Sequence, residues 1–326
     1  MNRTVDGLRL MCGGEPRRPG PGDYTPGAKK IHEEKRHKKE DFKAIFAEQR
    51  VYEKLLRWKK RRWAVLIAVN LFFMISYWVD VQALEGSLTG SRFVGFHLID
   101  LNSALQVMLA HKHVILNLLI GTATVGLGWL LLGGRSFCAW VCPYHLLSEL
   151  GEKLHLKLAA KKWVKDHPLH RGLRVALWLA FGALAYATGF TVYETISPTG
   201  ILSRALIYGP GVALLWVVAL LAFEVLYSRR AWCRYMCPIG LTYGVVGALS
   251  PVKITYDLAV CHHELECRKV CLVPHVLDHV IKGRATAEHL DVGADCTRCG
   301  MCVDVCPTHA LSFKITGLTR PPKGSR

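Results

Sequence analysis

Four cysteines near the C-terminus are the residues whose spacing most clearly indicates chemistry. They stand in the run C-T-R-C-G-M-C-V-D-V-C-P, three residues apart and then four, with Pro307 after the last. A loop of this kind wraps an iron–sulfur cubane with three thiolates, and in two-cluster proteins the fourth thiolate reaches the other cluster. A zinc site needs only two pairs of ligands, so the run favours iron–sulfur over zinc or a disulfide. The cysteines are Cys296, Cys299, Cys302 and Cys306.

A second, incomplete motif lies upstream in C-H-H-E-L-E-C-R-K-V-C-L-V-P. Its cysteines are Cys261, Cys267 and Cys271. The same spacing places Glu264 where a cysteine is expected and Leu272 where a proline is expected. If the fourth cysteine of each motif crosses to the other cluster, one [4Fe–4S] cluster, here named cluster II, has four thiolate ligands. Those ligands would be Cys296, Cys299, Cys302 and Cys271.

The other cluster, here named cluster I, has three expected thiolates and an open fourth position. The thiolates are those of Cys261, Cys267 and Cys306. The fourth iron would be bound by Glu264, by His262 or His263, or by no side chain. A carboxylate is a harder ligand than a thiolate, so this iron should be labile, and the cluster is either [4Fe–4S] or [3Fe–4S]. The alternative is a stretch that has lost its cluster and only packs.

Two alternating segments bracket both motifs. Residues 252–257 and 311–316 alternate apolar and polar side chains, which predicts two short strands, and residues 275–282 predict a short helix between the motifs. We therefore expect a small α+β domain of the bacterial-ferredoxin type over residues 251–316, followed by a tail at 317–326.

The part of the chain that must position these motifs is strongly apolar. Apolar residues make up 51% of the 326-residue chain, which is high for a soluble protein. Four stretches are long and apolar enough to cross a bilayer, and they cover residues 63–79, 114–132, 173–192 and 205–227. We therefore expect an all-α membrane domain over residues 63–250, with four transmembrane helices.

The distribution of Lys and Arg predicts the orientation of these spans. The segments before the first span, between the second and third, and after the fourth hold 18, 8 and 13 basic residues, whereas the other two loops hold 2 and 1. Basic loops stay on the cytoplasmic side. We expect a multi-pass protein of the bacterial inner (cytoplasmic) membrane, with both termini and the cluster domain in the cytoplasm.

The membrane part contains a repeat that carries four more cysteines. R-S-F-C-A-W-V-C-P follows the second span and R-A-W-C-R-Y-M-C-P follows the fourth, and runs beginning at Asp100 and Ser197 occupy matching places upstream. We interpret this as two parallel repeats of a two-helix unit, which would bring four thiols toward one axis. The thiols are those of Cys138, Cys142, Cys233 and Cys237.

The role of these four cysteines has three open interpretations. The C-x3-C spacing puts two sulfurs on one face of a helix, and the proline after the second cysteine ends or kinks that helix. The four thiols could form a shared metal or iron–sulfur site, act as a dithiol relay, or only pack as buried side chains.

The N-terminal region divides into two segments. Residues 1–28 are rich in Gly and Pro and are expected to be a disordered tail, with Cys12 an unmodified thiol. Residues 29–62 carry 14 Lys or Arg and predict a basic juxtamembrane helix, which either lies on the anionic leaflet or leads, solvated, into the membrane. A basic run beside a span reports orientation, so no nucleic-acid partner is expected. The apolar face of this helix would hold Phe42, Ile45, Phe46, Tyr52 and Leu56.

A set of four polar residues in the first outer loop has two interpretations. It contains His97, Asp100, His111 and His113. Histidine takes up a proton near neutral pH, which suits a quinol site. The alternative is four polar residues that share an exposed loop and nothing more.

The combination of four spans, two C-x3-C-P motifs and paired ferredoxin motifs resembles the NapH/MauN family of membrane-bound ferredoxin-type proteins. The membrane half is also similar to that of the NosR regulators, and the resemblance covers roughly residues 60–316. It implies electron transfer between the quinol pool and periplasmic enzymes such as nitrate reductase, or support of such enzymes. By resemblance, the seven C-terminal cysteines are cluster ligands, and the family pattern has a cysteine at Glu264 and a proline at Leu272.

The motifs and the resemblance together lead to one expected function and two alternatives. We expect a membrane-anchored iron–sulfur protein that links the quinol pool or cytoplasmic donors to a periplasmic reductase system. Its partners would be the membrane, a periplasmic redox protein, a second ferredoxin-type subunit and quinol. The alternatives are a maturation factor that delivers electrons to a periplasmic metalloenzyme cofactor, and a non-redox membrane scaffold. We see no nucleophile–base pair or phosphate-binding loop, so a quinol-dehydrogenase-type subunit is expected rather than a stand-alone catalyst.

Overall fold

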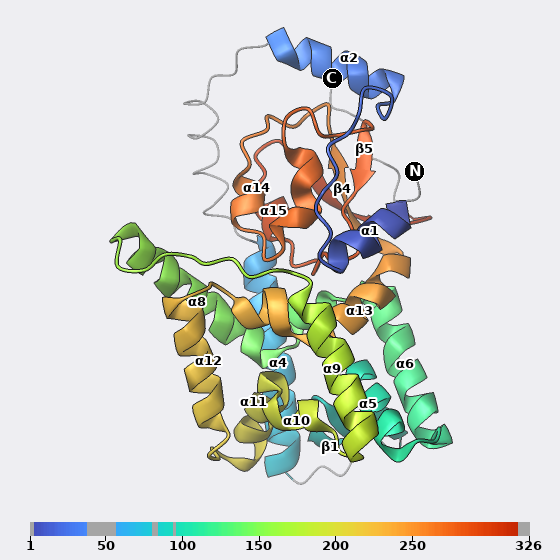
Figure 1. The fold of residues 1–326 in the computed structure, drawn as a ribbon, viewed down its shortest axis with the longest axis vertical. Coiled ribbons are helices and arrows are strands. Elements are labelled where there is room, and N and C mark those ends of the chain that lie inside the picture. The colour runs from blue at the N-terminus through green and yellow to red at the C-terminus, as the bar shows by residue number, and fades with distance from the viewer. Residues whose placement is uncertain (1–2, 38–56, 80–83, 94–95, 319–326) are drawn as a thin grey trace.

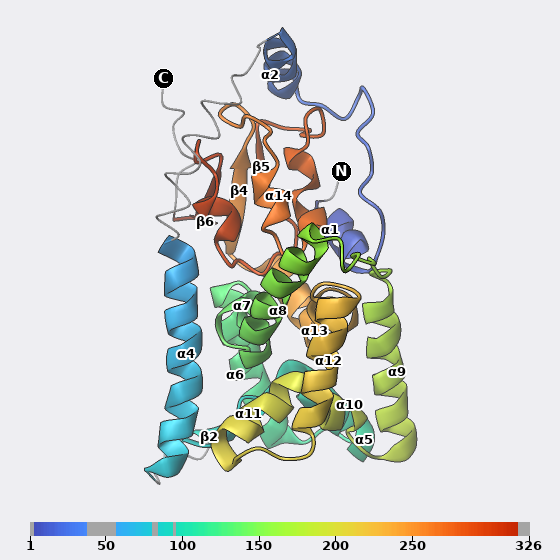
Figure 2. The same ribbon diagram turned by 90° about the vertical axis from the view of Figure 1, so that its left-hand side faces the viewer.

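Helices form most of the chain, and two small sheets lie at its opposite ends (Figure 2). The structure, a computed structural model, describes residues 3–37, 57–79, 84–93 and 96–318. One sheet belongs to a C-terminal part that sits on one end of a helical part, and the N-terminal helices pack on the C-terminal part (Figure 1). The cysteine motifs lie in the C-terminal part and at the end of the helical part that faces it.

The helical part is built from two runs in which the main helices follow the same order, with three strands in the first run where the second has a short helix. The first run consists of α4 (Arg57–Trp78), β1 (Leu84–Ser87), β2 (Gly90–Phe93), β3 (Phe96–Ile99), α5 (Leu101–His111), α6 (Leu116–Leu132), α7 (Ser136–Trp140) and α8 (Pro143–Ala160). The second consists of α9 (Leu173–Thr188), α10 (Val192–Ile196), α11 (Pro198–Tyr208), α12 (Leu214–Leu226), the π-helix η1 (Trp232–Met236) and α13 (Pro238–Leu249). Asp100 caps α5 and Ser197 caps α11, so the two matching sequence runs begin matching helices.

Helices of each run pack against helices of the other run. The short helix α5 of the first run packs against α9 of the second, and α11 of the second packs against α4 of the first. The helices after the cysteine motifs follow the same rule, because α8 packs against α12 and α13 packs against α6. The elements that carry the four C-x3-C-P cysteines are therefore held from both runs.

The four predicted spans correspond to α4, α6, α9 and α12, but these helices differ in length from the prediction. α6, α9 and α12 contain 17, 16 and 13 residues. Gly133 and Gly189 end α6 and α9 in the left-handed region, and the run Gly209-Pro210-Gly211 divides the fourth predicted span between α11 and α12. None of the helices that the structure describes combines the length and apolar sequence that a membrane crossing needs.

The C-terminal part has a three-stranded antiparallel sheet at its centre. β4 (Val252–Asp257) lies between β5 (His289–Asp291) and β6 (Leu311–Ile315), with Ile254 opposite Phe313. Both strands predicted from alternation are confirmed. Three short helices surround the cysteine loops: α14 (Glu266–Lys269), the 3-10 helix η2 (Pro274–Val280) and α15 (Met301–Asp304). The predicted helix at 275–282 is confirmed as this 3-10 helix, shifted toward the N-terminus.

Residues 3–28 do not form the disordered tail that composition predicted for residues 1–28. Residues Arg3–Met11 form α1, which packs against α13, and Met11 is buried beside Gly244. A second helix, α2 (Pro26–His37), lies on the C-terminal part, where the ring Nε2 of His32 lies 2.9 Å from the carbonyl oxygen of Ala285 (Figure 1). Partners distant in sequence order this segment. The predicted apolar face of Phe42 to Leu56 lies outside the described residues.

Candidate iron–sulfur sites

The four cysteines expected for cluster II lie together in the structure. Burial raises the pKa of Cys271 well above its usual value, and the nearby thiols of Cys299 and Cys296 raise it further. The same holds for Cys302, whose pKa is raised by burial and then by Cys299, Cys296 and Cys271. Cys271 comes from the upstream motif and the others from the downstream motif, so the crossed arrangement that the spacing predicted is the one that the fold brings together.

The three cysteines expected for cluster I form a second group. Burial raises the pKa of Cys267 to about 12, with smaller contributions from Cys261 and Cys306. All three line one cavity, and Glu264 lines it as well. All candidates for the fourth ligand of cluster I therefore lie at this cavity, because His262 and His263 line it as well as Glu264.

Main-chain N–H groups donate to sulfurs in both groups. The N–H of His263 donates to Cys261 Sγ at 3.3 Å, and the N–H of Arg298 donates to Cys296 Sγ at 3.4 Å. Both donors have a positive φ, the loop conformation that turns the N–H toward the sulfur. Hydrogen bonds to sulfur are one of the means by which a protein sets a cluster potential. The thiols of each group lie close to one another, which fits cluster ligation, because bound iron would hold them as thiolates.

The four C-x3-C-P cysteines converge on one cavity in the helical part. They are Cys138, Cys142, Cys233 and Cys237. Burial raises the pKa of Cys138 to about 12, and the guanidinium of Arg135 opposes that rise. The structure thus brings the two repeats together as the sequence predicted, and a cationic side chain stands beside the thiols.

The local geometry of these motifs differs from the prediction of one continuous helical face. Cys138 lies in α7 and Cys233 in η1, but the second cysteines are extended, with ψ of 117° at Cys142 and 112° at Cys237. The residue before a proline is disfavoured in the α region, so the first helix ends there. Proline then starts the next helix, α8 or α13, at its first position.

Two polar side chains of the second run contact the second cysteine of each C-x3-C-P motif. The hydroxyl of Thr199 lies 3.1 Å from Cys142 Sγ, and the hydroxyl of Tyr193 lies 3.8 Å from Cys237 Sγ. Thr199 is in the first turn of α11, so the positive end of that helix faces the cavity. A helix N-terminus favours thiolate or any other anion at this place.

Arg135 joins this cavity to the loop of cluster II. Its Nη1 donates to the main-chain oxygen of Asp295 at 2.9 Å and to the Asp295 carboxylate. Its Nη2 donates to the main-chain oxygen of Cys233 at 3.0 Å. Arg174 also donates to the Asp295 carboxylate, at 3.0 Å, and His275 Nε2 lies 2.8 Å from it. One buried arginine therefore contacts a residue of each of two cysteine motifs.

The charge of Asp295 is set by these neighbours. Burial alone would raise its pKa, but Arg135 and Arg174 outweigh burial and hold the pKa of the carboxyl well below its usual range. Two further contacts join the same parts: Trp140 Nε1 donates to the carbonyl of Arg298 at 3.1 Å, and Arg298 Nη2 donates to the carbonyl of Gly247 at 2.7 Å. The interface between the parts is thus polar: Asp295 is paired with two arginines, whereas the buried guanidinium of Arg298 donates to main-chain carbonyls.

Sequence reasoning missed Asp295, Thr199 and Tyr193. Arg135 was visible only as the basic residue at the start of the repeat, which Arg230 matches in the second copy. Arg230 forms an ion pair with Glu152 of α8, so the two matching arginines have different partners. The repeat was the one signal that could have drawn attention to Arg135.

The proposed quinol group in the outer loop is not assembled. Asp100 is 3% exposed, where it caps α5, whereas His97 and the pair His111 and His113 are exposed. His111 ends α5, so the eleven residues of that helix separate the histidine pair from Asp100. Of the two interpretations of these residues, the arrangement favours four polar residues that share no common site.

Among the described residues, no three His, Cys, Asp or Glu side chains are placed to hold a single metal ion. The ligands of a cubane do not share one metal, because each thiolate binds a different iron.

Comparison with known proteins agrees with both kinds of motif. A family model described as "4Fe-4S binding domain" matches residues 114–164 and 210–256, which contain the C-x3-C-P motifs, and another with the same description matches residues 294–312. No solved structure matches the chain.

Three curated relatives extend the similarity over most of the chain. "Ferredoxin-type protein NapH" of Haemophilus influenzae is 30% identical over 76% of this chain and 86% of its own length. "Methylamine utilization ferredoxin-type protein MauN" is 31% identical in Methylorubrum extorquens, covering 81% of this chain and 91% of the relative. In Paracoccus denitrificans it is 33% identical, covering 73% and 83%. The chain therefore belongs to the NapH/MauN family of ferredoxin-type 4Fe–4S proteins and is an iron–sulfur electron-transfer protein.

Proposed function

We propose that this protein holds three iron–sulfur sites in a row. Clusters I and II would be bound by the C-terminal cysteines as assigned above, and a third site by Cys138, Cys142, Cys233 and Cys237. The observation that carries the proposal is the contact of Arg135 with both Asp295, next to Cys296, and Cys233. One-electron transfer is the chemistry that such clusters supply when bound.

The side chains between the sites support this order. Leu272 follows Cys271 directly and lines the four-cysteine cavity. Arg234 of η1 donates to the carbonyls of Cys271 and Leu272, at 3.2 and 2.6 Å. At the other end, α2 covers the cluster I group, because Lys35 donates to the carbonyl oxygens of Leu258 and Cys261. The four-cysteine cavity thus adjoins the cluster II loop, and cluster I lies beyond it.

We further propose that residues 63–250 form a membrane domain and residues 251–316 a cytoplasmic two-cluster domain. Large apolar side chains are exposed along the helices that match the predicted spans. They include Ile67, Leu71, Phe72, Ile75 and Trp78 of α4, Leu119, Ile120, Leu127 and Leu131 of α6, Leu179 and Leu184 of α9, and Leu215, Val218 and Leu226 of α12. Apolar surface of this extent indicates contact with lipid or with another protein, and the basic segments favour lipid with the clusters on the cytoplasmic side.

The remaining part of the proposal concerns the partners. The protein would link the quinol pool or a cytoplasmic donor to a periplasmic reductase system, as the family resemblance implies. The names of the MauN relatives connect them to methylamine utilization. A cytoplasmic domain and a membrane domain in one chain, as proposed here, would suit electron transfer between a cytoplasmic donor and the membrane.

Iron and sulfide content, with redox titration monitored by electron paramagnetic resonance, test the third site. Anaerobically purified protein should contain three clusters per chain. The quadruple variant with serine at Cys138, Cys142, Cys233 and Cys237 should lose one cluster and keep the two C-terminal signals. Unchanged iron content in the quadruple variant would contradict the proposal.

A further inference from the structure

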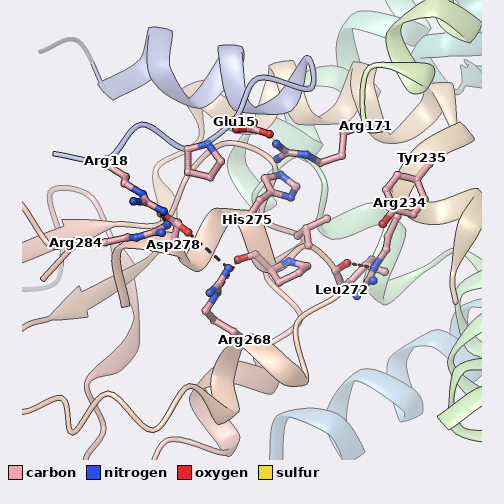
Figure 3. A pocket seen from close by; sticks show the side chains of 13 residues that line it. Glu15, Arg18, Arg171, Arg234, Tyr235, Arg268, Leu272, His275, Asp278 and Arg284 are labelled. Atoms are coloured by element: carbon pink, nitrogen blue, oxygen red, sulfur yellow. Dashed lines mark hydrogen bonds and ion pairs between the residues drawn. The ribbon is translucent and has the colours of Figure 1, made fainter. Parts of the chain in front are cut away.

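A cavity of ≈ 410 Å³ lies where the N-terminal segment, the C-terminal part and the helical part meet (Figure 3). Its size is in the range of small-molecule sites. Thirteen residues line it, and five of them are arginines against two carboxylates. The arginines are Arg18, Arg171, Arg234, Arg268 and Arg284. The cavity is therefore strongly positive, and no cysteine lines it, although Arg234 and Leu272 border both it and the iron–sulfur sites described above.

Arg234 is a buried cation whose hydrogen bonds go to neutral groups. It is 8% exposed, and its partners among the described residues are the main-chain carbonyls of Cys271 and Leu272. Glu152 lies near enough to act on the charge of Arg234 but does not hydrogen-bond to it, and the two carbonyl bonds use two of its five N–H donors. A buried guanidinium without a hydrogen-bonded carboxylate is costly. An anion in the cavity would supply the missing charge.

Arg171 repeats this pattern on the side of the N-terminal segment. It donates to the carbonyl oxygens of Gly14 and Leu10, at 2.6 and 3.5 Å, and both are again neutral acceptors. The bonds fix the guanidinium before any ligand arrives, which lowers the entropic cost of binding. Figure 3 shows Arg171 and His275 on one side of the cavity, with Arg18 and Arg284 on another.

The carboxylate of Asp278 neutralises only part of the remaining charge. Arg284 forms an ion pair with it, and Arg268 lies 3.6 Å from it. One carboxylate thus serves two guanidiniums, and Arg18 and Glu15 are exposed at the rim. The wall retains a surplus of positive charge spread over several chain segments.

We propose that this cavity binds a ligand that carries two phosphate groups. The planar fork of arginine matches phosphate oxygens in a bidentate manner, and guanidiniums on separate walls of a cavity this size suit two linked phosphates better than one. Tyr235, Pro16 and Pro274 supply apolar surface for the rest of the ligand. Two sources have this chemistry: the diphosphate of a free nucleotide, and the paired phosphates of a cardiolipin headgroup.

Calorimetric titration of the purified, cluster-loaded full chain in phosphate-free buffer tests the free-ligand source, with sodium pyrophosphate and ADP as probes. We expect one binding site that prefers pyrophosphate to orthophosphate. Arg234→Gln and the double variant Arg18→Gln/Arg171→Gln should each weaken binding by at least about tenfold, because hydrogen bonds to charged groups contribute that much. The double variant leaves the carbonyl bonds of Arg234 intact, so it covers the case in which Arg234→Gln does not fold. The matched control is Arg92→Gln, which removes an exposed arginine of β2 outside the cavity.

Native mass spectrometry from nanodiscs of phosphatidylcholine with and without cardiolipin tests the lipid source. One retained cardiolipin that is lost in Arg234→Gln and in Arg18→Gln/Arg171→Gln, but kept in Arg92→Gln, would support the same site with a lipid ligand. The proposal is overturned if pyrophosphate, ADP and cardiolipin all fail to bind, or if Arg92→Gln weakens binding as much as the cavity variants.

Discussion

Arg135 and Asp295 are 160 residues apart in the sequence and form a buried ion pair between the helical part and the C-terminal part. Their side chains are 1% and 2% exposed. Because Arg135 also donates to the carbonyl of Cys233, the pair fixes the position of the cluster II loop relative to the four-cysteine cavity. A buried arginine with three oxygen acceptors is a rigid connection, since its planar fork leaves little freedom.

Removing this connection should destabilise the protein strongly. Arg135→Gln leaves Asp295 buried with Arg174 as its remaining arginine partner, and we expect a loss of about 3 kcal/mol in the free energy of unfolding. Arg135→Lys should recover only part of that loss, because an ammonium does not reach all three acceptors. Denaturant unfolding followed by the visible absorbance of the clusters measures both variants.

The control for Arg135 is Arg229→Gln. Arg229 is 25% exposed and pairs with Asp166, which is 33% exposed, and at 3.8 Å with Glu152, which keeps Arg230 as its closer partner, so the loss of Arg229 should cost no more than about 1 kcal/mol. Equal destabilisation of the two glutamine variants would contradict the role given to Arg135.

The crossed assignment of the cysteines predicts two different losses. Cys271→Ser should remove cluster II and leave cluster I, although Cys271 belongs to the upstream motif. Cys306→Ser should remove cluster I and leave cluster II. Electron paramagnetic resonance with iron quantification distinguishes these outcomes, with Cys12→Ser as an unaffected control. Loss of the same signal from both variants would be inconsistent with the crossed assignment.

Cluster I should be the more labile of the two. Glu264 lines its cavity at the position where a fourth thiolate is expected, and a hard carboxylate releases its iron readily on oxidation. Mild oxidation of the wild type should therefore produce a three-iron signal, and Glu264→Cys should suppress it. Two four-iron clusters that survive oxidation unchanged in the wild type would show that Glu264 does not act in this way.

Local patterns predicted much of the C-terminal part. Alternation predicted both strands of the β4–β6 pair, although residues 254–257 of β4 are buried on both faces, and cysteine spacing predicted which thiols meet. The helix boundaries of the helical part were predicted less well. Pro210 and its flanking glycines lie inside a stretch that hydropathy alone treats as one span, although proline and glycine interrupt a helix.

Contacts between distant segments could not be predicted. Gly244 leaves space for Met11, whose sulfur would lie 2.5 Å from a Cβ at that position, so a Gly- and Pro-rich segment is ordered by a residue 233 positions later in the chain. The pairing of Arg135 with Asp295 has the same character. Each residue alone is an ordinary charged side chain, and only the fold makes them partners.

The proposed orientation predicts opposite accessibility at two kinds of loop. In a background without native cysteines, new cysteines at exposed Gly90 and Gly211 should react with a membrane-impermeant maleimide added to intact spheroplasts. A cysteine at exposed Lys162 should react only after the membrane is opened. Labelling of position 162 from outside would contradict the cytoplasmic placement of the clusters.

The central claim is that the four C-x3-C-P cysteines hold one redox site, and electron throughput per intact C-terminal cluster tests it most directly. Throughput is measured in the quadruple variant and in the four single variants Cys138→Ser, Cys142→Ser, Cys233→Ser and Cys237→Ser. If the four thiols hold one redox site, every single variant should lose throughput while both C-terminal signals remain. The quadruple variant should then be no worse, because residues that act as one unit are not additive. Near-normal throughput in the single variants, with stability losses that add up in the quadruple variant, would contradict the claim and leave these cysteines as packing residues.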